Sequence, residues 1–170
     1  MLDCNCIILW PAMKIVLGTV IFAFIAVGTV IIAIPHIILD SNMSILYESG
    51  IIRFFGIFPF TIGLILWTWS AWDFVVHGRR TPAPLYPPKQ LVSRGLYQIV
   101  RNPMYLAVVS ILLGEAIYFE SFAMFIYVVV IWLLFHLFVV CYEEPKNRKT
   151  FGKAYEDCYA KVSRWVPKIR

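Results

Sequence analysis

The chain has 170 residues, of which 61% are hydrophobic and 15% charged, and its net charge is +5. Soluble domains are usually closer to half apolar, and here the excess is concentrated in long runs. The basic residues flank these runs, which favours anionic lipid headgroups, an acidic cofactor or a topology signal over nucleic acid as the reason for the charge.

Each apolar run is close to the ~20 residues that cross a ~30 Å hydrocarbon core. We therefore predict an all-α integral membrane protein with about four transmembrane helices. The predicted spans are residues 15–34, 51–76, 104–119 and 122–140. Because four helices and their connections use most of the chain, residues 1–170 are predicted to form a single membrane domain.

The first span follows Met13-Lys14, which resembles the natural start of a membrane protein, so residues 1–12 are interpreted as an upstream extension. The apolar run is too long for the core of a typical signal peptide. Pro35 and His36 are expected to end it. The second span carries three tryptophans near its end, a pattern typical of the aromatic belt at a membrane interface.

A loop of residues 77–102 separates the second and third spans, and Glu120-Ser121 is the only link between the third and fourth. So short a link predicts an antiparallel helical hairpin. Residues 142–170 form a charged C-terminal segment with aromatics near helical spacing, so we expect it to be helical and amphipathic.

Thirteen of the fifteen Lys and Arg residues fall in the 77–102 loop or the 142–170 segment. With four spans these two regions lie on the same face, and the positive-inside rule makes that face cytoplasmic. Both termini are therefore predicted to be cytoplasmic, in the plasma or inner membrane if the host is prokaryotic.

Three features on this face could carry chemistry. The loop segment 81–89 holds four prolines, which stiffen the backbone and suit a loop that lines a site, although a rigid connector is the alternative. Asn102 suits the N-cap of the third span and Pro103 its first turn. The free N–H groups of that turn, together with Arg101, predict a site for an anion or carboxylate, with plain capping as the alternative.

The third feature is Glu143-Glu144, placed at the end of the fourth span. Adjacent carboxylates at a helix C-terminus repel each other and oppose the macrodipole, so a cationic partner or ligand is implied. His136 lies seven residues earlier, two helical turns, and is expected on the same face as Glu143. An ionisable residue in a span is a functional hypothesis, with a histidine bonded inside the bundle as the alternative.

Together these residues resemble the isoprenylcysteine carboxyl methyltransferase family, which is related to the membrane phospholipid methyltransferases. The resemblance covers roughly residues 50–170. It is carried by the run from Gly78 to Tyr105, Glu143-Glu144, Phe151-Gly152, Tyr155 and Arg164-Trp165-Val166-Pro167. Asn102 stands where the family has a histidine, and Ala107 where it has a glycine.

The resemblance implies S-adenosylmethionine as methyl donor, bound at the cytosolic side between the hairpin and the C-terminal segment. It implies cofactor-binding roles for Gly95, Tyr97, Arg101, Asn102, Pro103, Tyr105 and Glu144. Glu143 and Glu144 are also candidate catalytic residues, with His136. The implied acceptor is a hydrophobic or lipid-like small molecule, methylated on a carboxylate, with phospholipid N-methylation as the alternative.

Two other classes stay open. Membrane sterol reductases resemble this family in their C-terminal region and use a nicotinamide cofactor, but they are much longer. A small transporter or structural subunit would instead bury facing polar residues within its spans. The four cysteines show neither a disulfide framework nor paired ligand spacing, so no metal is expected.

Overall fold

The computed structural model describes residues 25, 27–41, 50–78, 95–153, 155–156 and 162–167, without the side chains of residues 74–78. Within these residues the regular secondary structure is helical, and one isolated β-bridge joins the non-helical residues 100 and 163. The α-helices are α2 (Ile34–Asp40), α3 (Ile57–Gly78), α4 (Pro103–Tyr118), α5 (Phe122–Phe138) and α6 (Glu144–Phe151). Two π turns, η2 (Thr29–Ala33) and η5 (Val139–Glu143), and two 3₁₀ turns, η3 (Ile52–Gly56) and η4 (Gly95–Gln98), adjoin or connect them.

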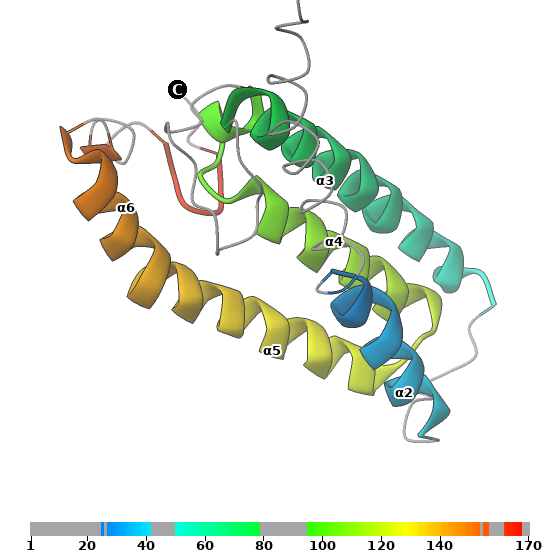
Figure 1. The fold of residues 1–170 in the computed structure, drawn as a ribbon. Coiled ribbons are helices and arrows are strands. Elements are labelled where there is room, and N and C mark those ends of the chain that lie inside the picture. The colour runs from blue at the N-terminus through cyan, green and yellow to red at the C-terminus, as the bar shows by residue number, and fades with distance from the viewer. Residues whose placement is uncertain are drawn as a thin grey trace, which may run out of the picture.

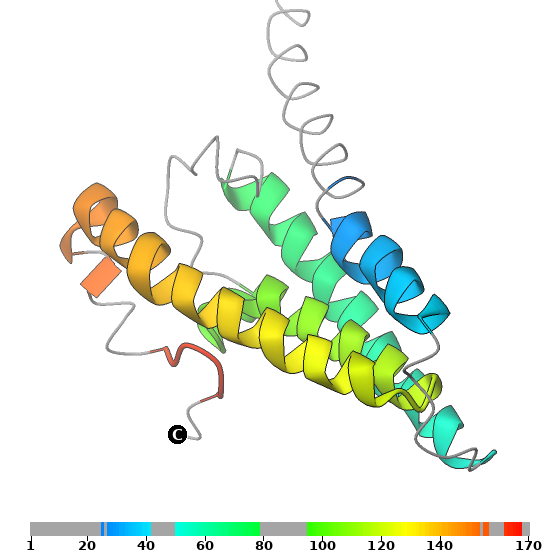
Figure 2. The same cartoon turned by 90° about the horizontal axis from the view of Figure 1, so that it is seen from below.

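Helix α4 lies between α3 and α5, and α2 packs against α5 (Figure 1). The view turned by 90° shows α5, η5 and α6 as one long helix that extends well past the bundle (Figure 2). Its far end carries α6 to the same end of the molecule as the start of α4. The polar residues just before α4 and those that follow α5 are therefore brought together at one end of the bundle.

Helices α3 and α4 approach each other through glycines. A Cβ added to Gly56 would lie 2.4 Å from the carbonyl oxygen of Gly114, and one added to Gly63 would lie 2.7 Å from that of Ala107. Small residues of this kind let two membrane helices come into backbone contact. Ala107 is fully buried in this contact, so it packs against α3.

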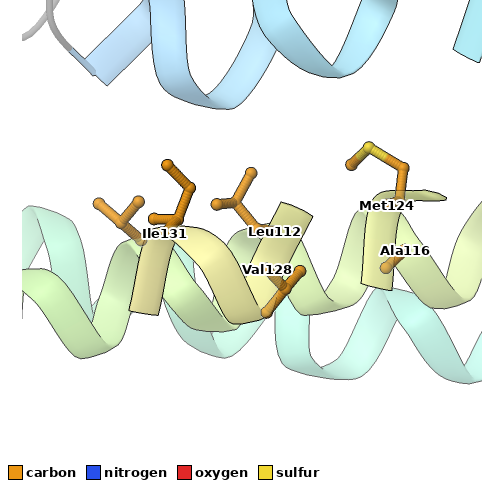
Figure 3. Packing of buried hydrophobic residues seen from close by; sticks show 6 residues of the cluster. Leu112, Ala116, Met124, Val128 and Ile131 are labelled. Carbon is orange, nitrogen blue, oxygen red and sulfur yellow. The ribbon is translucent and has the colours of Figure 1, made fainter. Parts of the chain in front are cut away.

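The apolar core lies where α4 and α5 face each other below α2 (Figure 3). Its buried members are Val108, Leu112, Ala116, Met124, Val128 and Ile131. Side chains of η2 and α2 pack against this cluster, as does Trp67 of α3. The core therefore ties the hairpin to the first described helix, while the opposite face of α5 stays apolar and exposed.

The predicted hairpin between the third and fourth spans is confirmed. Helix α4 ends at Tyr118, and α5 begins after Ser121, whose hydroxyl accepts a hydrogen bond from the N–H of Met124 at 3.3 Å. Glu120 adopts a positive φ of 49° in the link, which reverses the chain in two residues. A serine N-cap of this kind stabilises the start of α5.

Two described helices, Ile52–Asp73 and Phe122–Phe151, are long and apolar enough to cross a membrane. Only 17% and 22% of their most apolar windows are buried inside the protein, which is unlike the core helix of a soluble protein. Thr29–Asp40 and Pro103–Tyr118 are shorter apolar helices. The described helices agree with the all-helical prediction, but residues 162–167 are not helical, so the expectation of a helical C-terminal segment was wrong there. Most of the predicted first span and the proline-rich segment 81–89 lie outside the described residues.

The expectation that Pro35 ends the first helix was wrong, because the helix continues to Asp40. Pro35 sits in the first turn of α2, directly after the π turn η2. The helix is continuous at this point, because the N–H of Ile34 bonds to the carbonyl oxygen of Thr29 across η2, and the wider turn lets the chain stay helical past Pro35.

Candidate active site

The candidate site lies where residues 162–167, which we call the C-terminal strap, cross between α6 and the start of α4 (Figure 1). The strap is joined to the segment before α4 by a parallel bridge between Val100 and Ser163. The N–H of Arg101 donates to the carbonyl oxygen of Ser163 at 2.9 Å. These backbone contacts place the strap's side chains beside Arg101 and the end of the long helix.

Glu144 is the centre of an ion-pair network. Its carboxylate accepts from Arg164 Nε at 2.8 Å and Nη2 at 3.0 Å, and lies 3.2 Å from Nη1 of Arg101. Only 7% of Glu144 is exposed. A carboxylate this buried requires paired cations, and the prediction that the glutamates need a cationic partner is confirmed for Glu144.

Glu143 has a different partner. Its carboxylate accepts a hydrogen bond from the hydroxyl of Tyr105 in α4 at 3.0 Å. The Tyr105 ring in turn packs on Phe135 of α5, with ring centroids 4.8 Å apart. The two adjacent carboxylates therefore both face the start of α4 and the strap, one held by a neutral donor and the other by two cations.

The prediction that this pair closes the fourth helix was wrong. The π turn η5 ends at Glu143 and α6 continues directly from Glu144 to Phe151, so the glutamates lie inside a longer helix. The chain stays helical because the π turn accommodates Pro145 at the start of α6.

Asn102 occupies the N-cap position of α4, as predicted, but its side chain makes no cap hydrogen bond. Its amide Nδ2 instead donates to the carbonyl oxygen of Arg164 at 3.4 Å. The expected capping role is therefore wrong, and buried Asn102 fastens the strap to α4. Pro103 is buried at the first position of α4, where it was predicted.

Gly95 begins η4 with a φ of +55°, a conformation that favours glycine. A Cβ at this position would lie 2.1 Å from Oδ2 of Asp73, so the turn packs directly on the end of α3. Burial raises the pKa of the Tyr97 hydroxyl well above its usual range, with Glu143 and then Asp73 adding to the effect. Tyr97 is therefore a neutral hydroxyl between two acidic groups.

His136 is placed against tryptophans. Its Nδ1 accepts a hydrogen bond from Trp165 Nε1 of the strap at 3.1 Å, and its ring stacks on Trp132. The π turn between His136 and Glu143 inserts about one residue, which changes the helical phase by about 100°. The two residues predicted to share a face thus contact different neighbours.

Three residues at this site had no role assigned from the sequence: Asp73, Tyr155 and Arg164. Burial raises the pKa of Tyr155 and Glu144 raises it further, while the Arg101 guanidinium opposes both. The need of the glutamate pair for a cation was the signal that could have found Arg164. Tyr155 was marked by the family resemblance, but without a role. Asp73 gave no signal, because its place beside Gly95 depends on how α3 packs.

The family model for phospholipid methyltransferases matches residues 51–154. This match runs from the start of α3 past the end of α6, and it includes Arg101, Tyr105, Glu143 and Glu144. The chain belongs to the phospholipid methyltransferase family. No curated protein and no solved structure matches it.

Membership of this family supports the predicted class, a membrane methyltransferase. Enzymes of the family normally use S-adenosylmethionine, which carries a sulfonium, an ammonium and a carboxylate. The residues of the site fit such a molecule by their chemistry, because carboxylates, tyrosine hydroxyls and an arginine lie within one cluster. Among the described residues no three His, Cys, Asp or Glu side chains are grouped as metal ligands.

Proposed function

We propose that this protein transfers a methyl group from S-adenosylmethionine to the polar head of a membrane amphiphile, at the cytosolic mouth of its helical bundle. The observation that carries the proposal is the pair Glu143 and Glu144, held separately by Tyr105 and by two arginines beside the start of α4. The family match supports the reaction class. The resemblance to the isoprenylcysteine enzymes adds the assignment of the cofactor residues.

Gly95, Tyr97, Arg101, Asn102, Pro103, Tyr105 and Glu144 would hold the cofactor. When bound, it supplies a methyl group already activated by a sulfonium. The chain then has mainly to align donor and acceptor, since a displacement at carbon depends on in-line placement. Tyr105 fixes the Glu143 carboxylate, and Arg164 with Arg101 fixes that of Glu144, so both negative charges are preorganised.

We propose an amine rather than a carboxylate as the accepting group. Arg101 and Arg164 are both directed at Glu144, where they neutralise a carboxylate of the protein itself. Glu143, Tyr97 and Asp73 instead make an acidic and aromatic neighbourhood, in which burial raises the pKa of Tyr97 and the charges of Glu143 and Asp73 raise it further. Such a neighbourhood attracts a cationic head group and can accept the proton that an amine must lose before it attacks.

The membrane placement follows the charge pattern. The basic face that holds the site is cytoplasmic in this proposal, with both termini on that side and the protein crossing the membrane several times. The exposed apolar surface of α5 would border the acceptor's lipid chain while its head reaches the glutamates. In a prokaryotic host this places the protein in the plasma or inner membrane.

The first test is calorimetric binding of S-adenosylmethionine, S-adenosylhomocysteine and NADPH to the detergent-purified protein. Micromolar binding of both adenosyl compounds supports the proposal. Binding of NADPH alone would favour a reductase. Binding of none of them by folded protein would favour a transporter or structural subunit.

The second test identifies the acceptor by transfer of radiolabelled methyl groups. Vesicles containing phosphatidylethanolamine are compared with vesicles containing a prenylcysteine, at equal lipid concentration. Label in the phospholipid supports an amine acceptor. Label only in the prenylcysteine would instead establish carboxyl methylation and overturn the amine assignment.

A further inference from the structure

The long helix of this protein changes its winding just before the candidate site. Residues Val139–Glu143 form the π turn η5, in which the N–H of Glu144 bonds to the carbonyl oxygen of Val139, five residues back. Pro145 follows at once, in the first turn of α6. Such π turns are rare in proteins and occur frequently at functional sites.

The same pattern occurs in the first described helix. There the N–H of Ile34 bonds to the carbonyl oxygen of Thr29 across η2, and Pro35 follows in the first turn of α2. In both places the N–H that directly precedes the proline closes the wide turn. The repetition points to proline as the common cause, since the two segments otherwise share only a valine, Val30 and Val140.

The physical reason lies in the proline ring. Proline has no N–H to donate to the carbonyl four residues earlier, and its ring collides with that carbonyl in a regular helix. For Pro145 this carbonyl belongs to Cys141. A turn with one additional residue moves the carbonyl aside while the helix continues, so the π turn resolves the collision without a break.

The consequence at η5 concerns the two glutamates. Consecutive side chains on a regular helix are separated by about 100° around its axis. A wider turn has more residues, so the angle between consecutive side chains is smaller. Glu143 reaches Tyr105 and Glu144 reaches Arg101 and Arg164, so both carboxylates point to the same side of the helix. Because the π turn ends at Glu143, it sets the direction in which the side chains of Glu143 and Glu144 leave the helix.

We propose that Pro145 is a positioning residue, which keeps η5 as a π turn and thereby presents Glu143 and Glu144 together to the start of α4 and the strap. This inference rests on the proposed function in that the pair is taken to serve cofactor binding. Pro145 itself acts only through the glutamates.

The test compares Pro145→Ala and Pro145→Ser, which both restore a backbone N–H, with Pro35→Ala. The last variant is a matched control, because Pro35 follows an equivalent π turn on a helix that packs on the core. Each is purified in detergent and its affinity for S-adenosylmethionine is measured by calorimetry. We expect the Pro145 variants to bind at least about tenfold more weakly and Pro35→Ala to bind within about twofold of wild type.

A second readout requires no cofactor. Tyr105→Phe is introduced into wild type and into each proline variant, and the change in Tm is compared. If the π turn presents Glu143 to Tyr105, the substitution lowers the Tm of wild type and of Pro35→Ala but not that of the Pro145 variants.

Unchanged affinity or an unchanged Tyr105→Phe effect in the Pro145 variants would overturn the proposal. It would also be overturned if both Pro145 variants failed to fold while Pro35→Ala folded, since Pro145 would then serve folding rather than positioning. If wild type binds no S-adenosylmethionine, the proposed function fails. The Tm comparison then decides the role of Pro145 on its own.

Discussion

The guanidinium of Arg164 donates to both carboxylate oxygens of Glu144, through Nε at 2.8 Å and Nη2 at 3.0 Å. This contact joins the C-terminal strap to a helix residue twenty positions earlier. Both side chains are partly shielded, with 24% of Arg164 and 10% of Glu144 exposed. The strap is therefore part of the site, although it lies beyond the residues matched by the family model.

Arg164→Lys is expected to weaken this contact almost as much as Arg164→Ala, because an ammonium cannot reproduce the paired donation of a guanidinium. Each should lower the free energy of unfolding by about 1.5–3 kcal/mol, the range for hydrogen bonds to charged groups. Thermal unfolding in detergent measures the change. Lys149→Ala changes an exposed residue of α6 and serves as the control. If Arg164→Lys were as stable as wild type, the paired contact would be contradicted.

Glu144→Gln and Arg101→Ala are each expected to reduce the affinity for S-adenosylmethionine at least about tenfold, since each removes a charge from the ion-pair network. Both proteins should still be recovered in the membrane fraction. Glu156→Gln neutralises an exposed carboxylate outside the network and should bind like wild type. Wild-type affinity in both site variants would remove the proposed site.

Tyr105→Phe keeps the packing on Phe135 and removes only the hydroxyl that donates to Glu143. We expect kcat/KM to fall by at least about tenfold, because a hydrogen bond to a charged group contributes about 1.5–3 kcal/mol. Steady-state methyl transfer measures kcat and KM separately. A change confined to KM would assign Tyr105 to binding alone, and no change in either would exclude it from the site.

His136→Gln is expected to lower kcat less than about fivefold. The reason is that Nδ1 of His136 accepts from Trp165, and a glutamine oxygen can accept in its place. A general base would be worth about 10²–10⁴-fold in rate. A fall in kcat of that size near neutral pH, in a variant as stable as wild type, would show that His136 is a catalytic residue.

Gly114→Ala should destabilise the bundle, because the new Cβ would lie 2.6 Å from Cβ of Phe60 and 2.7 Å from the carbonyl oxygen of Gly56. Separating two packed helices to admit a methyl group costs about 1–3 kcal/mol. Thermal unfolding tests this against Leu64→Ala, which trims an exposed side chain of α3. Equal stability of Gly114→Ala and wild type would show that α3 and α4 can separate freely.

The helices at 57–78, 103–118 and 122–138 follow from the sequence because long apolar runs cannot remain in water and must satisfy their backbone groups internally. The hairpin follows in the same way, since two linking residues leave the chain no other path. The sequence also predicts that Glu143-Glu144 needs a cation, because adjacent carboxylates repel each other in any fold.

The ends of the helices were not readable from the sequence. The sequence pattern predicts that one helix ends at Pro35 and another at Glu143-Glu144. Both expectations assumed that a helix has only one winding, whereas a π turn lets it continue past a proline. The same turn moved His136 away from the direction of Glu143, since one added residue changes the helical phase by about 100°.

The sequence by itself determined that the chain is helical and apolar, that its basic segments gather around its polar motifs, and that a glutamate pair needs a partner. Only the tertiary structure decided which partner. Arg164 reaches Glu144 because the strap pairs with Val100 and Arg101, and Asn102 serves the strap rather than its own helix. Local periodicity is set by neighbours along the chain, whereas the contacts of the strap with residues 100–102 join positions about sixty apart and depend on how the helices pack.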